Sequence, residues 1–354
     1  MIKILYISLS ALVALLLSAC ASTIQIQALA PAAVQMPDNL QSVATANRII
    51  PTSSRNKFFD VLEGVFTGEG IGVDRAGADE CVNVVGQALA NNSYRFKVKQ
   101  AQLQLLGRSR EFFLPPLEPR YIKNLCRQNN VDGLVVLEAF DSDMALSHTN
   151  GSRTVKDKEG RERQIPTVYV EMIMKVVTGF RTYGGAEGFI LDQAKLEDRL
   201  AFSAEGDTYQ DALRRLPPPE ECIRRVAQVA GDRYARRIAP SYVNIARTYF
   251  SSAKGDPLMK QAALRADTRD WKGAEDLWKQ AARNLNPTIA GRAFYNLAVA
   301  SEVRGDLPSA VEWAKKSAYT CNNRQARGYL MVLNNRMREQ ELIREQLKSL
   351  PINN

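Results

Sequence analysis

The sequence predicts an α+β protein in which an N-terminal α/β sandwich domain with a mixed sheet precedes an all-α domain of tetratricopeptide-like helical repeats. Three observations predict this class. Residues 134–137 form an apolar run typical of a central strand covered on both faces. Helical patterns precede two strands in the first half, as in α/β proteins. Beyond Gly255, the distance from Ala274 to Ala310 is close to the roughly 34-residue period of tetratricopeptide repeats.

The first residues have the pattern of a secretory signal. Lys3 precedes an apolar run of about 15 residues, which is shorter than the roughly 20 that span a bilayer. The run ends in Leu17-Ser18-Ala19-Cys20, which resembles a bacterial lipobox and implies cleavage before Cys20 and its modification by lipid, palmitate included. We therefore expect the chain to be anchored to a membrane through Cys20. Ala21 in place of Asp implies, by resemblance to enterobacterial lipoproteins, the periplasmic face of the outer membrane.

Composition and charge limit the classes of partner. The 354 residues carry a formal net charge of +9, with 45% hydrophobic and 24% charged residues, as in a globular protein with a core. Export beyond the inner membrane excludes nucleic acid as the partner of this basic chain. Acidic lipid headgroups, cell-wall polymers and acidic proteins remain.

Cysteine and histidine usage predicts neither a metal site nor a cofactor. The only histidine is His148, and no two cysteines lie within a few residues of each other, so no zinc-ligand spacing results. In an oxidising compartment the four cysteines after Cys20 form one or two disulfides or are small buried residues. The sequence leaves both alternatives open for Cys81, Cys126, Cys222 and Cys321.

Composition divides the chain into four segments. Residues 1–19 are the signal peptide, and residues 20–39 are a nearly uncharged tether rich in Ala, Pro and Gln. Residues 40–253 form the α/β domain. Residues 254–350 form the helical repeats, with a C-terminal capping helix over 325–347.

The α/β domain is predicted to begin with a strand over 41–50 and a helix over 57–66. The glycines that follow at 68, 70 and 72 match neither the dinucleotide fingerprint nor a Walker loop, so we predict a flexible turn. A helix to residue 92, a strand over 94–98 and a helix over 121–126 lead to the central strand. Its end carries Glu138, Asp141 and Asp143, which we interpret as solvated charges in preference to a ligand site.

The next segment predicts the antiparallel part of the sheet. Residues 150–164 are dense in charged residues and predict a mobile hairpin loop, before the longest strand signal, over 167–183. A Gly184-Gly185 turn leads into a strand over 189–191, which makes the sheet mixed. Helices over 209–216 and 220–238 and a last strand over 242–250 complete the domain.

The helical repeats carry the candidate partner-binding residues. Such repeats recognise peptides or helices on a concave surface. The aromatic residues and one amide of the first helices are therefore the candidates: Trp271, Trp278, Tyr295, Asn296 and Trp313.

Four further motifs carry a family resemblance. They are FTGEGIGVD at 66–74, VDGLVVLE at 131–138, ILD at 190–192 and GDRYARRIAPS at 231–241. With the lipobox, they resemble an uncharacterised family of Gram-negative envelope lipoproteins, a domain of unknown function that joins an α/β domain to tetratricopeptide-like repeats. The resemblance implies no catalytic residue and no cofactor. The order of elements is also similar to the periplasmic α/β domains of curli-pore-type and peptidoglycan-synthase-activating lipoproteins, a resemblance of fold.

These features favour a non-enzymatic binding or scaffold lipoprotein, with the α/β domain near the membrane and the repeats bound to another envelope protein. The alternative is a structural subunit of an envelope secretion or wall-synthesis assembly that oligomerises through the α/β domain, with its hairpin over about 167–196. An enzyme is disfavoured, because Asp141 and Asp143 are the single weak catalytic candidate.

Overall fold

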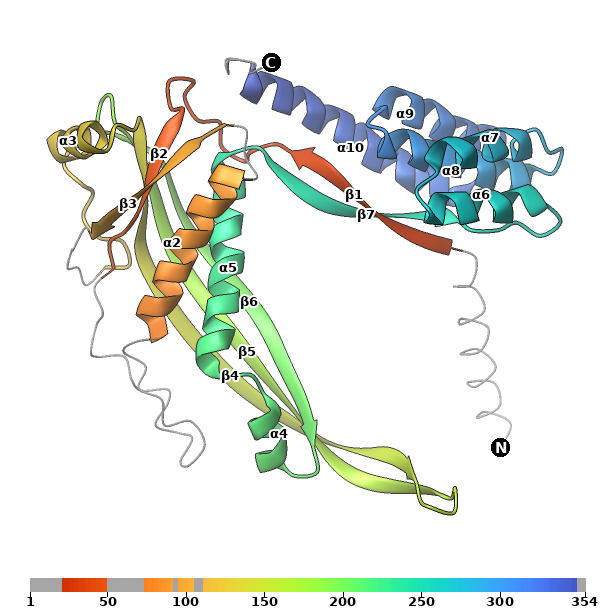
Figure 1. The fold of residues 1–354 in the computed structure, drawn as a ribbon, viewed down its shortest axis with the longest axis horizontal. Coiled ribbons are helices and arrows are strands. Elements are labelled where there is room, and N and C mark those ends of the chain that lie inside the picture. Colours follow the sequence, from red (N-terminus) through yellow and green to blue (C-terminus); the bar gives the residue numbers. More distant parts are fainter. Residues whose placement is uncertain (1–20, 50–72, 92–94, 105–110, 349–354) are drawn as a thin grey trace. The chain divides into compact units, whose positions relative to one another are not determined.

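The computed structural model describes residues 21–49, 73–91, 95–104 and 111–348. Its contacts divide the chain into two compact units. Residues 32–241 and 346–354 form one, called the sheet unit below, and residues 1–31 and 242–345 form the other, called the helical unit. The predicted α+β class, with a mixed sheet followed by a helical region, is confirmed (Figure 1).

A five-stranded mixed sheet forms the centre of the sheet unit. Its strands follow the order β3-β2-β4-β5-β6. Strand β2 pairs in parallel with β3 and β4, whereas β5 is antiparallel to both β4 and β6. The bounds are β2 Ser42–Asn47, β3 Lys97–Gln104, β4 Gly133–Lys156, β5 Glu162–Gly184 and β6 Ile190–Gly206.

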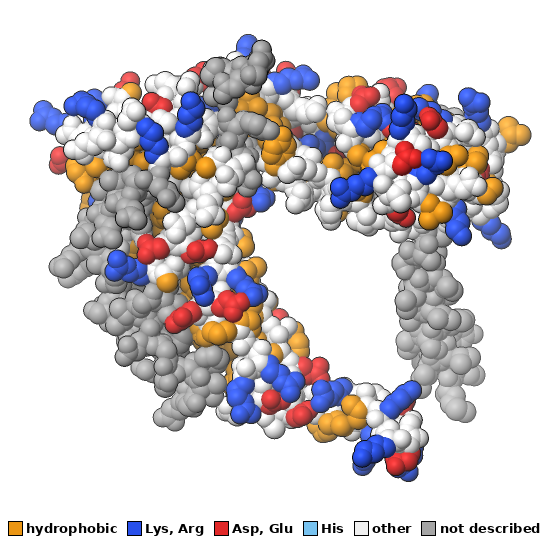
Figure 2. Space-filling view, viewed as in Figure 1, with side chains coloured by type: hydrophobic (Ala, Val, Ile, Leu, Met, Phe, Trp, Pro, Cys, Tyr) orange, Lys and Arg blue, Asp and Glu red, His pale blue; other side chains and the backbone are white. Residues whose placement is uncertain are grey.

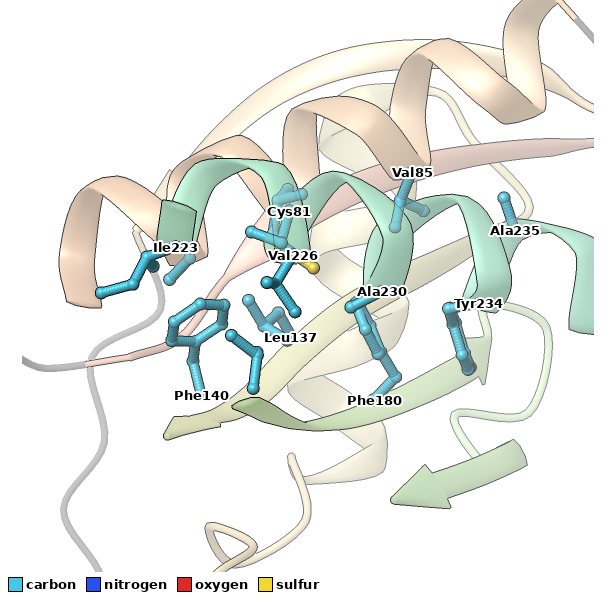
Figure 3. Close-up of a cluster of buried hydrophobic side chains, with 14 of the residues drawn as sticks. Cys81, Val85, Leu137, Phe140, Phe180, Ile223, Val226, Ala230, Tyr234 and Ala235 are labelled. Atoms are coloured by element: carbon cyan, nitrogen blue, oxygen red, sulfur yellow. The ribbon is translucent and has the colours of Figure 1, made fainter. Parts of the chain in front are cut away.

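Two long helices cover one face of this sheet. Helices α2 (Val73–Asn91) and α5 (Pro219–Ile238) lie side by side on it (Figure 1). Small side chains let them approach, and Gly231 leaves no room for a Cβ because the backbone oxygen of Cys81 would lie 2.5 Å away. Beneath α5, the ring of Tyr234 stacks on Phe180 at 4.2 Å (Figure 3). A short helix, α4 (Tyr209–Arg215), precedes α5.

Among the described residues, a helix packs on the opposite face near one end of the strands. Helix α3 (Pro119–Asn129) buries Ile122, Leu125 and Cys126 there, with Leu134 and Val136 of β4. Successive side chains of β5 point to opposite faces of the sheet. The even-numbered residues from Val170 to Phe180 point into the core under α5. Odd-numbered residues Tyr169 and Ile173 stay exposed, at 43% and 37%.

Strands β4 and β5 extend through the predicted loop over 150–164, so that prediction was wrong. Residue pairing runs without a break from Phe140 and Thr178 to Lys156 and Glu162. A tight turn closes the hairpin, in which Gly160 has a φ of 78° and Asp157 accepts from the backbone N–H of Arg161. Charged side chains of both signs gather at this tip (Figure 2). Most side chains on both faces of this ribbon are exposed, so backbone pairing rather than a core joins its two strands.

Strand β1 (Ala21–Ala30) corrects the prediction of an irregular tether over residues 20–39. It pairs with β7 (Ser241–Phe250) in a two-stranded sheet of its own. Residues 242–253, which we expected in the α/β domain, therefore belong to the helical unit with β1. The predicted boundary at 253 lies after β7, whereas the structural division lies after the first residue of β7, Ser241.

Six helical segments complete the helical unit. They are α6 Pro257–Asp267, α7 Trp271–Ala281, α8 Pro287–Val303, α9 Leu307–Lys315, the π-helical turn η3 Lys316–Thr320 and α10 Arg324–Leu347. Asp256, Asp270, Asn286 and Asp306 cap α6 to α9 by accepting from backbone N–H groups of the first turn. Helix α10 spans the range over which the sequence predicted a C-terminal helix, 325–347.

Several sequence predictions lie outside the described residues. These are the signal peptide with Cys20, the helix over 57–66 and the glycine turn over 68–72.

Candidate functional site

Three of the five predicted partner-binding residues lie in the core of the helical unit. Trp278 and Asn296 are fully buried, and Tyr295 is 9% exposed. Buried side chains are not available to a partner, so these three stabilise the fold instead. Trp271 and Trp313 are half-buried.

The buried aromatic residues attach strand β7 to the helices. The rings of Trp271 and Trp278 lie 6.0 and 5.9 Å from that of Tyr249, in edge contacts. Phe250 makes the same kind of contact with Tyr295 at 5.3 Å. Such pairs add about 0.5–1.5 kcal/mol each beyond the burial of area. Trp271 is thereby also part of the packing of β7.

A buried carboxylate that the sequence pattern did not indicate lies in the same region. Glu302 accepts from Arg247 Nε at 2.7 Å, from Arg247 Nη2 at 2.8 Å and from the Tyr329 hydroxyl at 2.6 Å. Burial, together with the charge of Glu302, raises the pKa of Tyr329 above its usual range. Because removal of one partner would leave a buried charge unpaired, this network fixes β7 on α8 and α10.

Trp313 lines a pocket of the helical unit. The pocket has a volume of about 560 Å³ and lies between α9 and α10, with Pro308, Val311, Trp313, Lys316, Asn334 and Met337 among its lining residues. One face of the Trp313 ring stacks on Phe294 with centroids 5.8 Å apart. Lys316 Nζ lies 4.5 Å from the ring centroid, and Met337 is 40% exposed.

The chemistry of this pocket suits a peptide side chain. A rigid aromatic ring, a flexible thioether and aliphatic walls provide apolar contact, while Lys316 and Asn334 provide polar groups at its edge. Lys315 is less available, because its Nζ donates to Glu312 at 2.8 Å.

The predicted acidic cluster of the sheet unit does not assemble. The strand continues past Glu138, and Glu138 is buried on the face that α3 covers, away from solvent. Asp143 pairs with Lys175 of β5 at 2.8 Å on the open face of the sheet. These carboxylates therefore form no shared site. The interpretation of all three as solvated charges at the end of a strand was wrong for Glu138, which is buried in a strand that continues past it.

Glu138 instead belongs to a buried network of the sheet unit. It accepts from Arg48 Nη1 at 2.8 Å and from the Tyr183 hydroxyl at 2.6 Å, and Arg181 Nη1 lies 3.5 Å away. The two arginines also donate to the carbonyl oxygens of Pro115 and Leu114, at 2.7 and 2.6 Å. The network holds the segment before α3 across the sheet.

Two of the family motifs meet in space. Asp192 of the ILD motif accepts two hydrogen bonds from Arg237 of the 231–241 motif, at 3.0 and 2.9 Å. The Tyr234 hydroxyl donates to the same carboxylate at 3.2 Å and also bonds Thr182. These residues join α5 to β5 and β6, so the motifs serve the fold here.

The thiols and carboxylates of the described ranges offer no metal site. No group of three His, Cys, Asp or Glu side chains among them is placed to hold an ion. The four cysteines after Cys20 are free thiols. Burial raises the pKa of Cys126 and of Cys222 to about 11, so neither forms a ready thiolate.

A search of the described helices for a membrane span finds none of sufficient length and apolar character.

The fold is thus an α+β protein with a mixed sheet, a two-stranded ribbon and a helical region. A family model described as Domain of unknown function (DUF8603) matches residues 40–250, and the chain belongs to that family. A second, described as Domain of unknown function (DUF6340), matches residues 260–342. The first match ends at residue 250 and the second begins at residue 260, so the predicted boundary at 253 lies between them.

The solved structures to which the chain is similar include a dodecameric protein. The PelC L103M dodecamer from Paraburkholderia phytofirmans is similar over 59% of this chain and 96% of that chain, with 10% sequence identity and a TM-score of 0.22. No curated protein matches the chain in sequence.

Proposed function

We propose that the protein is a lipid-anchored envelope protein of the periplasmic face of the outer membrane. In this proposal it acts without catalysis, as a binding or scaffold protein whose tetratricopeptide-like helices recognise another envelope protein. The lipobox at Cys20 and the absence of Asp at position 21 support the location. The pocket at Trp313 supports the binding role.

The Trp313 pocket carries the binding proposal. Interfaces derive most of their affinity from a few aromatic, methionine or arginine anchors in well-packed surroundings. Trp313 is held rigid by Phe294 and keeps part of its ring accessible beside exposed Met337. Lys316 at its edge favours a partner segment with an acidic residue next to an apolar one.

Photo-crosslinking in the protein's own cells tests this role. A benzophenone amino acid in place of Met337 should yield one defined cross-linked species, which mass spectrometry identifies. Lys316→Glu in the same protein should weaken that species, because it reverses the charge at the pocket edge. A control benzophenone in place of exposed Lys260 of α6 should not yield it. Equal yields from both positions, or no species from Met337, would contradict the proposal.

A second candidate function is a structural subunit that oligomerises through the sheet unit. Among the described strands, β6 is the last of the sheet, and no described strand pairs with the outer edge of its 17 residues, a geometry that favours pairing with another chain. Beside it, Tyr169 and Ile173 expose apolar area on the open face.

Native mass spectrometry over a wide range of protein concentrations tests this second function. An assembly that Ile173→Lys dissociates would support it, because a charge on the open face opposes apolar contact. A monomer at every concentration would contradict it.

A further inference from the structure

A second pocket of the helical unit lies where strand β1 begins. It has a volume of about 490 Å³ and is lined by residues that open α8 and α10, together with Ala21 of β1 and Phe250 of β7. It is separate from the Trp313 pocket, with which it shares no lining residue.

The wall of this pocket is built by close contacts. An ideal Cβ on Gly291 would lie 2.9 Å from Cys321 Cβ, so glycine lets the segment before α10 approach α8. The Ser317 hydroxyl donates to the carbonyl oxygen of Gly291 at 2.6 Å, and Asn323 Nδ2 donates to Ser317 Oγ at 3.1 Å. Asn322 between them has a φ of 55°. These bonds hold the segment before α10 against α8.

The charged residues that line this pocket are all basic. Two of its eleven lining residues are arginines, Arg292 and Arg324, and none is acidic. Arg292 lies over the Phe250 ring, 4.9 Å from its centroid, and Nη1 donates to the Ser252 carbonyl oxygen at 3.0 Å. Its remaining N–H donors, and those of exposed Arg324, which has no ion-pair partner in the described part of the chain, are left for an anion.

The position of Ala21 identifies the source of that anion. Ala21 directly follows Cys20, and consecutive Cα atoms are about 3.8 Å apart. A lipid on Cys20 enters the bilayer, whose headgroup zone is roughly 5–8 Å thick on each side. The pocket would then lie at the depth of the lipid phosphates.

We propose that this pocket binds the phosphate headgroup of an anionic phospholipid in the membrane that anchors Cys20. The inference rests on the lipid anchor of the proposed function. Arginine suits phosphate because its planar guanidinium presents paired donors. The apolar Phe250, Pro287 and Ala21 accommodate the glycerol end of the same lipid.

The inference places the helical unit at the membrane. We expected the α/β domain near the bilayer, with a tether between. Because β1 starts at Ala21 and pairs with β7, the helical unit is the part of the chain that follows the anchor directly. Its headgroup contact would hold the helices at the membrane surface.

Hydrogen exchange of the acylated protein in lipid nanodiscs tests the inference. Peptides that cover 287–292 and 321–325 should exchange severalfold more slowly in nanodiscs that contain phosphatidylglycerol than in phosphatidylcholine alone. Arg324→Glu should abolish that difference. Arg338→Glu, the same charge reversal at an exposed position further along α10, should retain it.

Other outcomes overturn the inference separately from the proposed function. Equal exchange in both lipids, or equal loss in both variants, would exclude a site for an anionic phospholipid headgroup at this pocket. Equal protection by inorganic phosphate in phosphatidylcholine nanodiscs would assign the pocket to a soluble anion and overturn it as well. The intact mass of the purified protein reports acylation of Cys20 independently, so an unacylated chain would contradict the anchor itself.

Discussion

The side-chain amide of Asn296 hydrogen-bonds both backbone groups of Phe250. Nδ2 donates to the Phe250 carbonyl oxygen at 2.7 Å, and the Phe250 N–H donates to Oδ1 at 2.8 Å. Asn296 thus takes the place of a neighbouring strand at the end of β7. A buried amide can satisfy both groups, whereas an apolar residue would leave them unpaired.

Asn296→Asp should destabilise the helical unit by about 1–3 kcal/mol, because the carboxylate cannot donate to Phe250 and its charge is buried. The three tryptophans of the chain all lie in this unit, so their fluorescence in urea reports its unfolding. Asn334→Asp, at an exposed amide of α10, is the control and should leave the midpoint unchanged. Equal midpoints for both variants would show that the amide does not hold β7.

Two Gly→Ala changes in helices should change the stability of the protein in opposite directions. At Gly328 of α10 a Cβ meets no atom within 4 Å, so alanine should stabilise by about 0.5–1 kcal/mol through lower freedom of the unfolded chain. At Gly231 the Cβ would meet the Cys81 oxygen, and the separation of α2 and α5 should cost about 1–3 kcal/mol. Hydrogen exchange of the backbone amides of α10 measures the first change, and that of α2 and α5 measures the second. A Gly231→Ala protein with slower exchange in α2 and α5 would refute the close packing.

Glu138→Gln should be among the more damaging single changes in the sheet unit. It leaves Arg48 and Arg181 buried without a counter-charge, and loss of one partner of a buried ion pair costs about 3–5 kcal/mol. Exchange of the amides in β4, β5 and the segment 111–117 should accelerate. Glu162→Gln, at the exposed start of β5, is the matched control. Unchanged exchange would mean that the network does not hold that segment.

The stability of the helical unit should fall at alkaline pH. Burial, and then Glu302, raise the pKa of Tyr329 in the folded protein above the ordinary value of about 10, and burial raises that of Tyr249 to about 12. The contribution of each tyrosine is complete below about pH 10. It is lost as the pH rises toward the folded pKa, because the unfolded chain ionises first.

Urea midpoints between about pH 8 and about pH 11 measure this dependence. Tyr329→Phe should reduce the alkaline fall, and Tyr319→Phe, at a 74% exposed ring, should not. A fall of equal size in the two variants would show that Tyr329 does not cause it.

Strand β1 shows a limit of prediction from local sequence patterns. Ile24, Ile26 and Ala28 alternate with Gln25 and Gln27, which is a strand period, yet the low charge and the prolines nearby indicated a tether. What makes it a strand is pairing with β7, more than two hundred residues later in the chain. Likewise, the charge-rich residues over 150–164 carry no apolar alternation, and only their antiparallel pairing makes them strands.

The sequence by itself determined the apolar central strand, the mixed sheet and the C-terminal helices, because each depends on a local period or on a short motif. The tertiary structure decided which polar residues meet: Glu138 with Arg48, Asp192 with Arg237, and Glu302 with Arg247. It also decided that Trp278 and Asn296 are core residues while Trp313 lines a pocket. Burial and pairing between distant residues depend on how the elements pack, and a local sequence period does not specify that packing.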